Sequence, residues 1–201
     1  KVTATTFLPG DTILLKSGSV WNGEWLWPKG SGTADAPIKI DKYGGDALPV
    51  INGMGIDRGM NYSGAVHLRN QEYWEIRNLE VTNDDDFDVD IDLSRPQGDN
   101  SWSSQAETRN GILIIADGDL LNDGDDGIFD HIYIENCYVH DVDGPNDWND
   151  TFTGGIIYNV VGTKIRPNTS FRDIRIAYNT IRKVDLLGIT GFVQMAKSGY
   201  Q

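Results

Sequence analysis

Three stretches of the chain share one pattern: YWEIRNLEV at 73–81, IYIENCYV at 132–139 and IRIAYNTI at 174–181. When the stretches are aligned, their apolar positions fall into two columns: Ile76 with Ile134 and Ile176, and Val81 with Val139 and Ile181. Apolar and polar residues alternate as in a β-strand with one buried face, and the alternation breaks for a residue or two where a chain turns. Each stretch therefore predicts two short strands joined at a corner.

A further apolar run precedes each pair of predicted strands, at 65–68, 111–116 and 155–160, and a fourth run follows at 188–193. The repeating unit is thus strand, corner, strand, corner, strand, with a loop of variable length before the next unit. Units of this size cannot bury an apolar face alone, so they stack on one another. This pattern predicts an all-β solenoid, a parallel β-helix.

The alternative fold is an antiparallel sandwich with irregular hairpins. Hairpins favour short loops with Asn-Gly or Asp-Gly at the turn, whereas Asn110-Gly111 opens a predicted strand and the loops are long and acidic. Asn179 takes the position held by Leu79 and Cys137, which suits a corner where its amide can bond the backbone. Cys137 is then a small buried apolar residue and not a catalytic thiol.

Composition narrows the class of partner. The 201 residues fit a single globular domain, and 17 Lys and Arg against 30 Asp and Glu give a net charge of -13. A field of this sign repels phosphate backbones and anionic lipid, so neither nucleic acid nor a membrane surface is an expected partner. The one cysteine excludes an intramolecular disulfide. The chain has no apolar run of about 18 residues, so no transmembrane helix is expected.

The whole of residues 1–201 is expected to form one β-helix domain or a fragment of one. Its parts are N-terminal coils at 1–60 and regular coils at 61–201, with long acidic loops at 84–109, 117–130 and 143–153. The last coil starts near Gly188 and would leave an uncovered end, which natural solenoids cap. We therefore expect the β-helix to be incomplete at its C-terminal end and to be completed by more of the chain or by a second polypeptide.

Sequence resemblance makes this expectation more specific. The segments PGDTIL (9–14), GTADAPIKI (32–40) and PVI (49–51) resemble the opening of secreted bacterial right-handed β-helix proteins of the pectate-lyase-like superfamily. WEIRNLEVTN (74–83) and IENCYVHDVDG (134–144) are similar to glycoside hydrolase family 136, the lacto-N-biosidase type. The resemblance implies a right-handed parallel β-helix, an extracellular or cell-surface location, and hydrolysis of a glycosidic bond in an oligosaccharide or glycan.

Stacking also places the acidic loops. The loops after Val81 and Val139 leave corresponding corners of successive coils, and Asp185 follows the same corner one coil later. Because adjacent coils lie about 4.8 Å apart, these segments must share one side of the solenoid. The sequence predicts a lateral acidic cleft there.

Two aspartates in this region are the predicted catalytic pair, Asp143 and Asp150. A glycosidase needs two carboxyls about 5 Å apart for retention of configuration or about 6.5–9.5 Å for inversion, with one of them protonated. The pair flanks a turn that carries Trp148, and an aromatic ring can stack on a sugar. The resemblance implies a closely spaced aspartate pair of this kind. The predicted substrate-binding residues are Trp148, Trp102, Asp141, Asp147, Asp185 and Arg109.

The second acidic loop resembles a calcium site. Asp117, Asp119, Asp123 and Asp125 alternate with glycines as calcium ligands do, although they miss the EF-hand spacing. We expect a structural Ca²⁺ there and no organic cofactor. Two other functions stay open: a calcium-dependent polysaccharide lyase, with its base among Arg109, Arg182 and Lys183, and a non-catalytic carbohydrate-binding or adhesion solenoid.

Other aromatic residues are expected to be structural. His67, His131 and His140 lie in or beside predicted strands without a nucleophile partner. Trp21, Trp25 and Trp27 are expected to pack under a loop or a cap, with stacking on sugar as the alternative.

Overall fold

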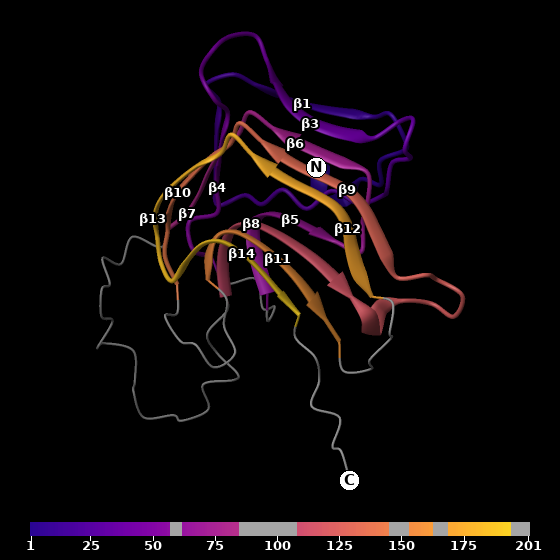
Figure 1. Cartoon of the computed structure of the whole chain (residues 1–201). Helices are drawn as coiled ribbons and strands as arrows, with labels where there is room; N and C mark the ends of the chain where they lie inside the picture. Colours follow the sequence, from indigo (N-terminus) through magenta and orange to yellow (C-terminus); the bar gives the residue numbers. More distant parts are fainter. Residues whose placement is uncertain (57–61, 85–107, 145–152, 163–168, 194–201) are drawn as a thin grey trace, which may run out of the picture.

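A computed structural model describes residues 1–56, 62–84, 108–144, 153–162 and 169–193 of the chain (Figure 1). The regular secondary structure of the described part is almost entirely β. Its strands are β1 (Thr12–Lys16), β2 (Val20–Asn22), β3 (Ile38–Tyr43), β4 (Val50–Asn52), β5 (Tyr62–Arg69), β6 (Trp74–Arg77), β7 (Glu80–Asn83), β8 (Thr108–Asp117), β9 (Ile128–Glu135), β10 (Tyr138–Val142), β11 (Gly154–Val161), β12 (Ser170–Ala177), β13 (Thr180–Val184) and β14 (Leu187–Val193). Two 3₁₀ helices, η1 (Val2–Ala4) and η2 (Gly118–Leu120), complete it.

The strands form three sheets that surround one core (Figure 1). The first sheet has the order β1-β3-β6-β9-β12, the second β2-β4-β7-β10-β13, and the third β5-β8-β11-β14. Successive strands of the chain belong to different sheets. Within each sheet, neighbouring strands come from adjacent coils and pair in parallel. The fold is therefore a parallel β-helix, as predicted, and the antiparallel sandwich is wrong. No helix in the described part of the chain is long and apolar enough to span a membrane.

The register between coils matches the sequence alignment. Ile76 pairs with Ile134, which pairs with Ile176, and Val81 pairs with Val139, which pairs with Ile181. Ile76, Ile134, Val81 and Val139 are fully buried. The two columns of apolar residues therefore run through the interior of the solenoid.

The corners between the first and second sheets repeat as well. Asn78, Asn136 and Tyr178 follow β6, β9 and β12, and all three have a positive φ, between 55° and 59°. Asparagine tolerates this left-handed conformation better than most residues. It turns the chain sharply, so the next strand can join a different sheet.

The corner amide of Asn179 behaves as predicted. Its Oδ1 accepts a hydrogen bond from the Cys137 backbone N–H at 2.8 Å, and its Nδ2 donates to the Ile134 carbonyl at 2.8 Å. Cys137 is buried, and this burial raises the pKa of its thiol to about 12. Such a thiol is inert as a nucleophile at neutral pH, which agrees with its structural assignment.

Two predicted loop boundaries are wrong, because the strands that follow the loops begin earlier than expected. β8 begins at Thr108, so Arg109 lies in a strand and not in the loop predicted at 84–109. β9 begins at Ile128, which shortens the loop predicted at 117–130. Both strands are extended by pairing with the coil next to them, as Thr108 does with Tyr62 and Ile128 with Ser170.

Stacking should control the stability of the core. Ile134 is fully buried between two coils, whereas Ile176, its partner in the same column, is only partly buried. We expect Ile134→Ala to lower the free energy of unfolding by about 2–5 kcal/mol, and Ile176→Ala to cost distinctly less. Urea unfolding of both variants measures the difference. Equal losses would contradict the stacking argument.

Candidate functional site

Three acidic residues follow β7, β10 and β13 at one corner of the solenoid. They are Asp84, Asp143 and Asp185, and we call this place the acid corner. The Asp185 N–H donates to the Val142 carbonyl at 2.9 Å, and the Gly144 N–H donates to Asp185 Oδ2 at 3.3 Å. The prediction that the first and third acidic loops leave corresponding corners, with Asp185 one coil later, is confirmed.

Arg109 brings a positive charge to the acid corner. Its Nη1 lies 3.5 Å from Asp143 Oδ1, and the two side chains are 11% and 22% exposed. Gly144 allows this close packing, because a Cβ there would lie 2.8 Å from Thr153 Oγ1 and 3.2 Å from Arg109 Cβ. Asp143 and Gly144 therefore pack where the chain leaves β10, against Arg109 of β8 and Thr153, the residue before β11.

The backbone carbonyl of the buried residue Asn83 supports Asp143 from the preceding coil. The Asn83 carbonyl accepts the Asp143 N–H at 3.4 Å. The Asn83 side chain accepts from the Gly55 N–H at 3.0 Å and donates to the Asn110 carbonyl at 3.1 Å. Asn83 thus ties the preceding corner to β8, next to Arg109, and to Asp143. Sequence reasoning missed this residue, because its partners are distant in the chain.

A second polar cluster lies just before Asp143 on β10. Asp141 has a φ of 46° and bonds His140 Nδ1, and its other oxygen lies 3.5 Å from Lys183 Nζ. The hydrogen bond from His140 lowers the pKa of Asp141 below its usual value, and the charges of His140 and Lys183 act in the same direction. His140 Nε2 lies 3.1 Å from Glu80 Oε1. The cluster links neighbouring strands of the second sheet, which agrees with the prediction that His140 is structural.

The second acidic loop begins at the far end of the third sheet, away from the acid corner. Asp117 bonds both Nε and Nη2 of Arg69 and caps η2 by accepting from the Asp119 N–H at 2.9 Å. Asp125 Oδ2 accepts from the Asn122 N–H at 2.8 Å. Among the described residues, no group of three or more His, Cys, Asp or Glu side chains could hold a metal ion. The calcium site at Asp117, Asp119, Asp123 and Asp125 stays a prediction.

Several predicted site residues lie outside the described ranges: Asp150, Trp148, Trp102 and Asp147. The structure therefore places Asp143, Arg109, Asp185 and Asp141 of the predicted site. Asp143, Arg109 and Asp185 come together at the acid corner, and Asp141 lies beside it on the second sheet.

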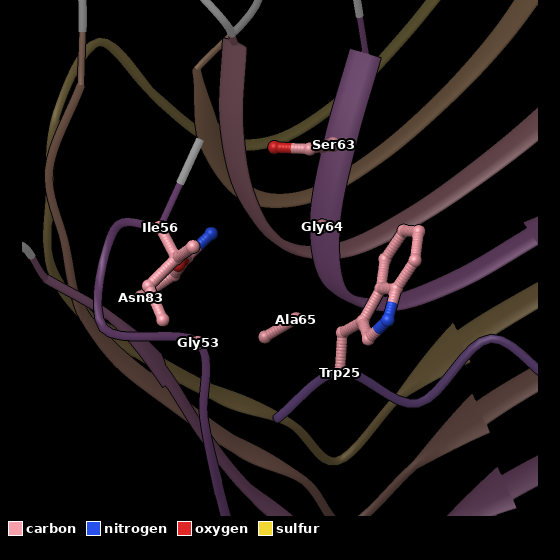
Figure 2. Close-up of a pocket in the computed structure, with 7 residues that line it drawn as sticks. All are labelled: Trp25, Gly53, Ile56, Ser63, Gly64, Ala65 and Asn83. Carbon is pink, nitrogen blue, oxygen red and sulfur yellow. The ribbon is translucent and has the colours of Figure 1, made fainter. Parts of the chain in front are cut away.

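The aromatic residues of the first coil have separate environments. Trp27 stacks on His67, with ring centroids 4.7 Å apart and an interplanar angle of 7°. Burial, and secondarily the charge of Arg69, lowers the pKa of His67 to about 3, so this histidine is neutral at physiological pH. Trp21 packs against the core. Trp25 lines a small cavity (Figure 2).

Comparison with known proteins agrees with this fold. No protein-family model matches the chain. The chain is 30% identical, over 222 aligned positions and 90% of its length, to the lacto-N-biosidase of Bifidobacterium longum subsp. longum. The chain resembles GH136 lacto-N-biosidases. The native crystal structure of the GH136 lacto-N-biosidase from Eubacterium ramulus aligns with 96% of the chain at a TM-score of 0.75 and 25% identity. Its selenomethionine derivative aligns with 94% at a TM-score of 0.73 and 25% identity.

These relatives are much longer than the region that matches. The GH136-like chain spans 13% of the length of the curated relative and 31–32% of the solved structures. The resemblance stated from the sequence is confirmed, and it covers the coils that carry the acid corner.

The role of Asn83 can be tested against Asn179, which makes the same kind of backbone bonds at another corner. Replacing either residue by alanine should cost about 1–3 kcal/mol of stability, because buried backbone groups lose their partners. Only Asn83→Ala should speed hydrogen exchange at the Asp143 amide, because loss of the side-chain bonds to Gly55 and Asn110 loosens the residue-83 carbonyl that accepts the Asp143 N–H. Unchanged protection at Asp143 in Asn83→Ala would contradict the proposed support.

Proposed function

We propose that this chain carries the catalytic aspartates of a glycoside hydrolase of the lacto-N-biosidase type, namely Asp143 and Asp150. One observation carries the proposal. Asp143 lies at the acid corner, held by Arg109 and by the backbone of Asn83, in a chain that resembles GH136 enzymes along nearly its whole length. Asp150 follows it in the same short loop.

The surroundings of Asp143 suit glycosidic bond cleavage. Such cleavage requires one carboxyl that is protonated and one that is ionised. A nearby guanidinium favours the ionised form of a carboxyl, and a nearby carboxylate favours the protonated form. At the acid corner the Arg109 guanidinium lies 3.5 Å from Asp143, and Asp185 follows the neighbouring strand.

The substrate class follows from the relatives. Both are named lacto-N-biosidases, and we extend that activity to this chain, with a glycan or oligosaccharide as substrate. A location outside the cell or at its surface belongs to the same proposal, because such glycans are found there.

The lyase alternative receives less support from the geometry. A lyase needs a base and a cation that neutralises the uronate. Among the three candidate bases, Arg109 is paired with Asp143 and Lys183 with Asp141. The binding-module alternative differs from the proposal only in turnover, which an assay decides.

Substitution of the aspartates tests the proposal. We expect Asp143→Asn and Asp150→Asn each to lower turnover by about 10²- to 10⁴-fold, because proton transfer or nucleophilic attack is lost. The measurement is release of the aglycone from a chromogenic aryl lacto-N-bioside. Azide should restore part of the activity to whichever variant has lost the nucleophile or base.

The matched control is Asp173→Asn on the first sheet. Asp173 has a φ of 61°, which asparagine also tolerates, and it bonds the Tyr133 hydroxyl away from the acid corner. Activity within about threefold of the parent in both Asp143→Asn and Asp150→Asn would eliminate the assignment. An unsaturated product would instead indicate a lyase, and binding of glycan without turnover a binding module.

A further inference from the structure

Strand β10 contains one more residue than β7 directly before the acid corner. β10 pairs with β7 at Val139 and again at Val142. Two residues lie between these positions, but only one residue lies between their partners, Val81 and Asn83. Such an inserted residue forms a β-bulge, which bends its strand and can change the direction of a side chain. The bulge ends just before Asp143, the aspartate at the acid corner.

The inserted residue takes a left-handed backbone conformation. Asp141 has a φ of 46°, and Lys183, at the corresponding place of β13, has a φ of 49°. A residue with a Cβ adopts this conformation at a cost in energy, which is smallest for asparagine and aspartate. Such backbone strain persists only where the surrounding structure holds it, and it is often found at functional sites. The contacts of Asp141 therefore need an explanation.

The bulge determines the side of the strand on which Asp143 lies. Side chains alternate along a regular strand, so with Val139 inward the alternation would place Val142 outward and Asp143 inward. In the structure Val139 and Val142 are both buried in the core. Asp143 instead lies next to Arg109, with 22% of its side chain exposed. The inserted residue thus keeps Val142 in the core and directs Asp143 to the acid corner.

Side chains from three neighbouring strands hold the bulge. The Asp141 carboxylate bonds His140 Nδ1 and lies 3.5 Å from Lys183 Nζ of β13. His140 Nε2 lies 3.1 Å from Glu80 Oε1 of β7, and the imidazole stacks on Tyr138 with ring centroids 4.1 Å apart. Asp141 is thus connected to β13 directly and to β7 through His140. These contacts oppose a return of Asp141 to an extended conformation.

Left-handed residues also occur on the first sheet. Tyr73, His131 and Asp173 occupy the same place in three successive coils, with φ values of 57°, 53° and 61°. The conformation is therefore not by itself a sign of function. Asp141 differs because Asp143 follows it by two residues, which is at most about 7 Å of extended chain. A change of backbone at Asp141 must move Asp143.

We propose that Asp141 is a positioning residue for Asp143. Its polar contacts fix the left-handed bulge that directs the Asp143 carboxylate to Arg109. The inference rests on the proposed function, because the direction of Asp143 affects turnover only if Asp143 is catalytic. The sequence predicted that Asp141 binds substrate, whereas in this proposal Asp141 acts through the backbone and does not touch the substrate.

Three substitutions separate the backbone of Asp141 from its side chain, with kcat and KM measured on the aryl lacto-N-bioside. Asp141→Asn tolerates the left-handed conformation and can still accept from His140, so kcat should stay within about threefold of the parent. Asp141→Gly accepts the conformation but loses the contacts, and kcat should fall about tenfold. Asp141→Val also opposes the conformation, and kcat should fall about 10²-fold, as a misplacement of about 1 Å can cause. KM should change less than about twofold, because no contact with the substrate is removed.

Asp173→Gly and Asp173→Val are the matched controls. Asp173 also has a left-handed backbone and a bonded side chain, but it lies in β12 on the first sheet. Both controls should keep kcat within about threefold of the parent at a temperature where melting curves show every variant to be folded. Parental kcat in Asp141→Gly, or equal losses of kcat in the Asp141 and Asp173 variants, would overturn the proposal. If Asp141→Val does not fold, the two glycine variants decide.

Crystal structures of the glycine variants give a measurement that does not depend on turnover. The distance from Arg109 Nη1 to Asp143 Oδ1, 3.5 Å in the parent, should exceed about 4 Å, the limit for an ion pair, in Asp141→Gly but not in Asp173→Gly. If the parent hydrolyses the aryl lacto-N-bioside but Asp141→Gly keeps both kcat and this contact, the positioning role is wrong and the function stands. If the parent shows no hydrolysis but the contact is lost only in Asp141→Gly, the function is wrong and the structural role of Asp141 stands.

Discussion

The parallel register between coils is the constraint on which the rest of the structure depends. Ile76, Ile134 and Ile176 lie above one another, as do Val81 and Val139. A shift of one residue would turn every inward side chain of a strand toward solvent. The buried columns therefore lock the register, and the register in turn aligns the ends of β7, β10 and β13. The acid corner is a direct consequence of how the core packs.

The register and the place of the acid corner could be predicted from the sequence, because the inward positions are apolar in each coil. The residues that align in the three stretches are the residues that pair between coils. This pairing places the acidic loops at a common corner. Asn179 was predictable too, because a polar residue in an apolar column needs a local backbone partner. These features depend on neighbours that resemble one another from coil to coil.

Other features depend on partners that no local pattern reveals. Arg109 belongs to β8 through pairing with β5, although its flanking residues have little strand character. Asn83 has partners in three separate segments. The calcium-like spacing around Asp117 is a pattern within one loop, and the preceding coil supplies Arg69 to that carboxylate. The spacing of residues within one loop contains no information about a charged side chain that the preceding coil supplies.

Each coil satisfies the backbone hydrogen bonds of its strands through the strands above and below it. Between β10 and β11 the chain departs after Gly144 and returns at Thr153, and between β13 and β14 it turns within two residues. Excursions of very different length thus share one scaffold. A segment at this corner can be lengthened, shortened or exchanged while the frame beneath it is preserved, which makes the solenoid a modular platform for loop redesign.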